Sequence, residues 1–272
     1  MLSRRTAFYI LLAGVFCSAF VAKDPDWMLR ISEKQVDFKK IQKLAKSNPL
    51  ASDVYISNGA IDIFPKELFQ LERLRLLMLG NIQLGNPQQF NKDLCGCKNV
   101  TKLQFNMTNQ TALNLWDDCQ LLYLRELSIV SLKLKELKIR PWNPTLKMLT
   151  IFDTELGALP EKFETIDHLE SLTISKNPNM DLSKELPKIK TQTRLKTLAL
   201  AYYELKTIPA EVFELKTIEE LQLHGNDFTA FDERLTTLPN LKKMKFSQNK
   251  TPFSEQLKKE FADKLPDCKI QY

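Results

Sequence analysis

The chain has 272 residues, of which 43% are hydrophobic, 26% are charged and only seven are glycine. This composition suits one folded domain and argues against a flexible linker or a low-complexity region. The formal net charge of +6 comes from lysines that are interspersed with glutamates. Since no arginine-rich stripe of the kind that contacts phosphates is present, we expect no nucleic acid among the partners.

The first 22 residues have the order of a secretory signal peptide. A basic segment, MLSRRTAF, precedes the apolar YILLAGVFCSAFVA. The 16 residues from Ala7 to Ala22 are too few for a spanning helix. Small residues favour a signal over 1–19 with cleavage after Ala19, and cleavage as late as Ala22 is the alternative. We therefore expect a secreted, periplasmic or cell-envelope protein that has no membrane span after signal removal.

Two other roles for this N-terminal segment stay open. The apolar stretch is an uncleaved anchor in the first of them. In the second, Cys17 carries a lipid and anchors a lipoprotein, although the preceding Gly14, Val15 and Phe16 fit a lipidation box poorly. Both alternatives place the protein at a membrane surface instead of releasing it.

Residues 23–50 are expected to form an N-terminal helical cap. Apolar residues occur from Trp27 to Leu44, and the later part of the segment is amphipathic at helical spacing. A helix that binds a membrane surface would need a more strongly basic face. The segment is therefore expected to cover the open end of the structure that follows it.

From Ala51 onward the pattern L-x-x-L-x-L, with close apolar substitutes, returns about every 23 residues. The clearest copies read LKMLTI, LESLTI, LKTLAL, IEELQL and LKKMKF. The copies start at positions 51, 74, 100, 124, 146, 169, 195, 218, 241 and 265. The prediction is about nine repeats over 51–264 and a half-repeat that caps the C-terminus over 265–272.

Each repeat contains one short strand and one outer segment. The alternation L-x-L has the period of a strand, and stacked strands bury their leucines in one continuous core. The second half often reads L-P-x-x-x-F-x-x-L, as in LPEKFETIDHL and IPAEVFELKTI. Proline favours the first turn of a helical or 3₁₀ segment, so we expect such segments on the opposite side of the core.

This grid, its period and the segments AKSNPLASDVYISN and LKKEFADKLPDCKIQY resemble the leucine-rich repeat family. The likeness covers residues 48–272 and is strongest to secreted or envelope-associated bacterial members. It implies an α/β solenoid: a horseshoe with a parallel concave sheet and a helical or 3₁₀ convex side. It also implies a role in protein binding.

The asparagine that follows the strand in this family is present in only some repeats. It stands at Asn177, Asn226 and Asn249, and one residue early at Asn58 and Asn81. The equivalent positions of the other repeats hold Thr108, Leu132, Thr154 and Tyr203. We therefore expect local irregularity in the middle of the solenoid.

Four cysteines remain after signal removal. Cys97 and Cys268 occupy positions of the grid that are buried in other repeats. Cys95 and Cys119 both lie five residues before a repeat start, so stacking brings them within the reach of a disulfide, which an exported protein can form. Two separate small hydrophobic side chains are the alternative, and Cys97 is a competing partner.

The second, fourth and sixth residues after each repeat start are expected to face the concave side. They carry little charge and include the apolar Leu76, Met78, Val130, Met148 and Phe152. An apolar patch with a polar surround is typical of a protein interface. We predict a site on strands two to six with Met78, Met148 and Phe152 as anchors, and a broader surface of Met78, Gln104, Ser128, Val130, Met148, Thr150, Phe152, Thr173, Gln222 and His224.

A second and weaker patch includes Tyr202, Tyr203 and His224, although Tyr203 takes the place of a turn asparagine and has a structural alternative. Catalytic motifs are missing. His168 and His224 fall in different repeats, and no zinc spacing, phosphate loop or nucleophile elbow occurs. We expect no metal, no cofactor and no enzymatic activity.

Two functions remain. The first is an exported, monomeric binding protein that takes a protein or peptide on its concave face. The alternative is a structural envelope or adhesion component that binds surface polymers or host ligands through charges on its flanks. Salt screens charges and affects an apolar contact little, so salt dependence separates the two.

Overall fold

The computed structural model describes residues 28–32, 38–61, 66–107, 110–115, 119, 121–131, 133–139 and 144–272. The predicted signal peptide, its cleavage site and Cys17 lie outside these residues. In the described part of the chain, no helix is long and apolar enough to cross a membrane.

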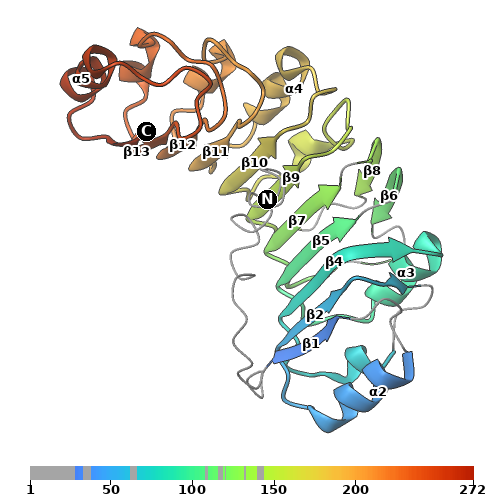
Figure 1. Ribbon diagram of the computed structural model, residues 1–272. Helices are drawn as coiled ribbons and strands as arrows, with labels where there is room; N and C mark the ends of the chain where they lie inside the picture. The colour runs from blue at the N-terminus through green and yellow to red at the C-terminus, as the bar shows by residue number, and fades with distance from the viewer. Residues whose placement is uncertain are drawn as a thin grey trace.

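The described chain is a curved solenoid built on one long parallel sheet (Figure 1). Its strands lie side by side along the arc, and α3 (Pro87–Leu94), α4 (Leu182–Ile189) and α5 (Glu255–Lys264) lie on the outer side. The strands in their order across the sheet are β1 (Met28–Ser32), β2 (Asp53–Ser57), β4 (Leu76–Leu84), β5 (Lys102–Met107), β7 (Glu126–Ser131), β9 (Met148–Phe152), β10 (Ser171–Ser175), β11 (Thr197–Ala199), β12 (Glu220–Gln222), β13 (Lys243–Lys245) and β14 (Lys269–Gln271).

The register of the sheet is the register of the leucine grid. Leu77, Leu103, Leu127, Leu149 and Leu172 stand opposite one another across five neighbouring strands and are all buried. One apolar core runs from Ala45 to Phe261. The α/β solenoid with a parallel concave sheet, which the repeat pattern predicts, is confirmed.

The register of the last strand differs from the prediction by two residues. The grid set Cys268 opposite Met244, but the structure pairs Met244 with Ile270 and Lys243 with Lys269. The reason is α5, which ends at Lys264 and is followed by a turn before β14 begins. Cys268 is therefore half-buried and only packs against the core, instead of lying in it as predicted.

The convex side is partly 3₁₀ and partly β. The 3₁₀ helices η1 (Lys66–Gln70), η2 (Phe163–Thr165), η3 (Ala210–Glu214) and η4 (Glu233–Thr237) follow the expected pattern. In the middle, however, β6 (Ala112–Leu115) and β8 (Glu136–Ile139) form a separate two-stranded parallel sheet, and β3 (Ala60–Ile61) extends the pairing of β4. Figure 1 shows β6 and β8 beside β5 and β7. The prediction of an all-helical or 3₁₀ convex side is wrong for these coils.

The N-terminal end is closed by a helix and a strand. The helix α2 (Phe38–Ser47) contacts η1. The strand β1 lies within the segment expected to be helical, and it pairs in parallel with β2. This strand pairs with the backbone N–H and C=O groups that β2 would otherwise expose at the edge of the sheet. Hydrophobic spacing in the sequence does not indicate such a pairing.

Two turn asparagines show how adjacent coils are joined. The amide oxygen of Asn226 accepts from the backbone N–H groups of Tyr203 and Leu205, both at 3.1 Å. Its amide nitrogen donates to the carbonyls of Leu200 at 2.8 Å and Leu223 at 3.0 Å. Asn177 likewise accepts from Thr154 of the preceding coil. Each asparagine thus satisfies the turn before it.

Candidate functional site

The parallel register arranges the concave residues in rows that cross the strands. The row at the fourth place of each repeat forms the centre of the face. From β2 to β13 it contains Tyr55, Met78, Gln104, Ser128, Thr150, Thr173, Ala199, Gln222 and Lys245. The first eight of these residues are uncharged, and we call them the central row.

Charges on the concave face occur beside the central row, mostly in pairs. Lys102 and Glu126 lie 2.8 Å apart on neighbouring strands. Glu220 contacts Lys245 at 2.6 Å and Lys243 at 3.5 Å near the C-terminal end. Between these groups, β9, β10 and β11 contribute no charged residue to their concave positions. The middle of the face is therefore neutral and polar.

Of the three predicted anchors, only Met148 is strongly exposed, at 43%. Met78 is partly exposed. Phe152 and Val130 are 2% and 8% exposed, so the expectation that they form part of an accessible patch is wrong. Phe152 lies at the end of β9, where its ring meets the edge of Tyr202 at a centroid distance of 6.4 Å and lies 5.9 Å from Lys176 Nζ. Phe152 is a packing residue of the sheet edge.

Tyr202 spans three coils at that edge. Its hydroxyl donates to Gln248 Oε1 at 2.7 Å. Between them lies Gly225, which has a φ of +63°, and a Cβ there would come within 2.2 Å of the Tyr202 ring. The absence of a side chain at Gly225 lets the ring lie flat along the coils. Tyr203, by contrast, accepts from Asn177 through its hydroxyl at 3.2 Å and belongs to the turn, as the structural alternative supposed.

His224 lies on the concave side and is held by a neighbouring hydroxyl. Its Nδ1 is 2.6 Å from Ser247 Oγ. Burial and then the charge of Lys245 lower the pKa of His224 below its ordinary value, so the ring is neutral at pH 7. His168 lies on the convex side beside Asp167, and the two histidines share no site. The described residues contain no group of three or more His, Cys, Asp or Glu side chains placed to hold a metal ion.

The predicted cysteine pair is joined in the structure. Cys95 follows α3, and a disulfide links it to Cys119 with a Cα–Cα distance of 5.9 Å. Cys97 is a separate buried thiol, and burial raises its pKa to about 12. The spacing left open a Cys95–Cys119 disulfide, two separate thiols, or a disulfide with Cys97. The structure therefore shows the first of these, which links adjacent coils, and Cys97 lies in the core.

A hollow lined by amide side chains lies outside the concave face. It has a volume of about 480 Å³ and lies between the start of α3 and the outer face of β6. Its lining consists of Gly85, Asn86, Pro87, Gln88, Asn91, Lys92, Ala112 and Asn114. Sequence reasoning missed it, because it depends on β6 taking the place of a helix.

No family model matches the sequence, and no curated protein matches it either. Several solved structures have a fold similar to that of this chain. The Drosophila Toll–Spatzle complex gives a TM-score of 0.60 at 13% identity over 94% of this chain and 38% of that one. The TLR13–ssRNA13 complex gives 0.50 at 15% identity over 89% and 40%. A leucine-rich repeat protein of Leptospira interrogans gives 0.41 at 19% identity over 86% and 74%.

The chain thus spans about two fifths of the length of the first two of these proteins. The bacterial subgroup stays a prediction, because these likenesses speak for the fold alone. The repeating core, the parallel register and the similarity to Toll together show that this chain has the leucine-rich repeat fold.

Proposed function

We propose that this chain is an exported, non-enzymatic and monomeric protein that binds a protein or peptide on its concave face. The observation that carries the proposal is the neutral central row, beside which Met148 is exposed. A surface that only has to keep the protein soluble is usually rich in charged side chains. Amide, hydroxyl and flexible thioether side chains instead suit contact with another protein. Toll, which has the same fold, is solved in complex with Spatzle.

The rows also favour one region of the face over the others. Gln104, Ser128, Thr150 and Thr173 are all partly exposed and lie in register on four successive strands. Met148 lies on one of these strands, two residues from Thr150. We therefore propose β5 to β10 as the binding region, with Met148 as its apolar anchor and without Phe152.

A photo-crosslinking residue at Thr150 tests this placement. Thr165 provides the matched control, because it belongs to the same repeat but is exposed in η2 on the convex side. A protein captured from the host envelope or culture fluid at Thr150 and not at Thr165 would support the concave site. Met148→Lys should then weaken that complex at least tenfold, and raising the salt concentration should change it little. Equal capture at both positions would contradict the proposal.

The alternative function, binding of surface polymers or host ligands, has one observation in its favour. The amide-lined hollow beside α3 offers Asn and Gln groups that donate and accept hydrogen bonds, as sugar hydroxyls require. Binding of a neutral oligosaccharide that Asn114→Ala weakens, in a protein that captures nothing at Thr150, would favour this alternative.

A further inference from the structure

The C-terminal cap contains a cluster of aromatic rings that pack edge to face. Phe246 lies 5.7 Å from Phe228 and 5.3 Å from Phe261, measured between ring centroids. Phe231 lies 4.9 Å from Phe261. These rings come from three segments: the loop before η4, the residue after β13, and α5. They close the last coils of the core.

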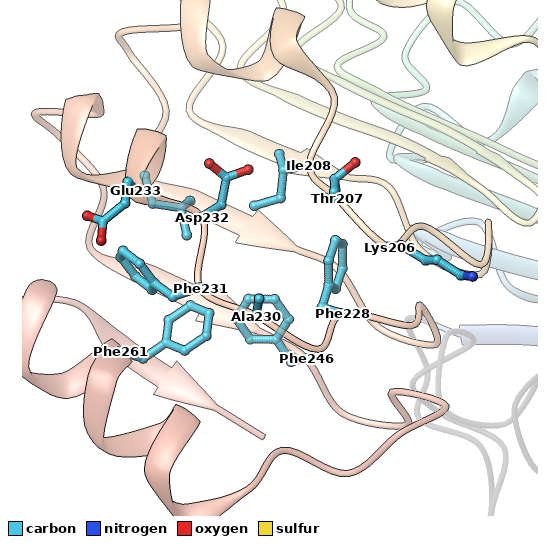
Figure 2. A pocket seen from close by; sticks show the side chains of 11 residues that line it. Lys206, Thr207, Ile208, Phe228, Ala230, Phe231, Asp232, Glu233, Phe246 and Phe261 are labelled. Atoms are coloured by element: carbon cyan, nitrogen blue, oxygen red, sulfur yellow. The ribbon is translucent and has the colours of Figure 1, made fainter.

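The rings do not fill the space between these segments. A cavity of about 230 Å³ remains, with Lys206, Thr207, Ile208, Phe228, Ala230, Phe231, Asp232, Glu233, Leu235, Phe246 and Phe261 as its lining. Figure 2 shows the rings of Phe228, Phe246 and Phe261 grouped around this space. Thr207, Ala230 and Glu233 are exposed, which places the opening on their side.

The size and lining of the cavity fit one aromatic ring system. An apolar cavity of about 150 Å³ is enough to bind benzene, so this volume holds a single or fused ring and little more. Phenylalanine walls offer edge-to-face contacts to such a ring. The polar residues Lys206, Thr207 and Glu233 are exposed and lie at the opening, whereas the inner end is apolar and favours an uncharged ring over a strongly hydrated ligand.

One acceptor lies beside the apolar walls. Asp232 caps η4, and Arg234 donates to its two carboxylate oxygens at 2.9 and 2.7 Å. The hydrogen bonds from Arg234 hold the pKa of this carboxyl below its ordinary value. Since an ionised carboxylate has about four acceptor positions, Asp232 can accept one more N–H or O–H donor.

We propose that this cavity is a binding site for an uncharged aromatic ring that carries one hydrogen-bond donor, of the indole or phenol class. The ring lies among Phe228, Phe246 and Phe261, and its donor reaches Asp232. Free aromatic molecules and the tryptophan side chain of a partner share this chemistry. The site is independent of the concave face.

Titration of the full chain with indole, followed by calorimetry and by the shift of the unfolding temperature, tests the site. Indole should bind at one site and raise the unfolding temperature. Ala230→Phe should fill the cavity and reduce indole affinity at least tenfold. Ala158→Phe is the matched control, because Ala158 occupies the same place three coils earlier and is also exposed. Its indole affinity should be unchanged.

Asp232→Asn tests the polar contact without removing the helix cap, since asparagine caps helices equally well. It should weaken indole binding about threefold to tenfold, because a hydrogen bond to a charged acceptor becomes a neutral one of about half the strength, and leave the affinity for benzene unchanged. N-acetyltryptophan amide and a tryptophan-containing peptide distinguish the two sources of the ring. If they bind as tightly as indole, the ligand is the side chain of a partner protein. If the cavity excludes them, the ligand is a free aromatic molecule. Absence of indole binding to the unaltered chain, or equal loss in the Ala158→Phe control, would overturn the proposal.

Discussion

At the scale of single residues, contacts between stacked coils decide which side chains of the concave strands are accessible. Met148 is exposed, whereas Phe152 on the same strand is buried. The ring of Tyr202, which lies 50 residues later in the sequence, packs against Phe152. The repeat pattern predicts which side of the sheet each side chain faces. It does not predict which residues of other coils pack against that side chain.

Asn226 gives a residue-scale prediction. Asn226→Ala removes an amide that makes four hydrogen bonds to the backbone, and it takes this partner from two part-buried N–H groups and two buried C=O groups. The free energy of unfolding, measured with urea, should fall by about 3 kcal/mol. Asn240→Ala, which removes one exposed hydrogen bond to Lys216, is the control and should change it by less than about 0.5 kcal/mol. Equal effects would contradict the structural role of the turn asparagine.

At the scale of elements, leucine spacing predicts the register of the concave strands from the first to the ninth repeat, apart from a shift of one residue between Gly80 and Ile82 at the end of the β4–β5 pairing. The exceptions are β6, β8 and β14, whose positions depend on contacts other than the leucine pattern. The segments ALNL and ELKI alternate like strands and form β6 and β8 as each other's partners. Likewise, β14 starts two residues late because α5 and its turn take up the intervening chain.

The disulfide between the coil of α3 and the next one leads to a second prediction. It closes a segment of 24 residues. Cross-linking a loop of this length stabilises a fold by about 3 kcal/mol, chiefly by restricting the unfolded chain. Cys119→Ser should therefore lower the free energy of unfolding by about that amount. The unaltered chain measured under reducing conditions should match it, and Cys268→Ser should have a small effect. Stability that does not respond to reductant would contradict the cross-link.

At the scale of the whole molecule, each coil contacts mainly its neighbours, as the pairing order of the sheet shows. A defect in the core should therefore act locally. Leu172→Ala in β10 creates a cavity in a fully buried position. Hydrogen exchange followed by mass spectrometry should become faster in β9, β10 and β11 and remain unchanged in β2 and β13.

Val54→Ala is the matched control at the other end of the solenoid, since Val54 is also fully buried and lies in β2. It should accelerate exchange in β1, β2 and β4 only. Faster exchange in every strand of either variant would mean that the whole solenoid opens as a single unit.

The contact of Tyr202 with Gly225 and Gln248 has a mechanical consequence. A rigid ring fixed across three successive coils acts as a strut on one margin of the sheet. Bending that changes the curvature of the arc must shear these coils against each other, and the strut resists that shear. The coils of β11, β12 and β13 are therefore expected to move as one stiff segment, and adaptation of the arc to a bound partner to be concentrated nearer the N-terminal end.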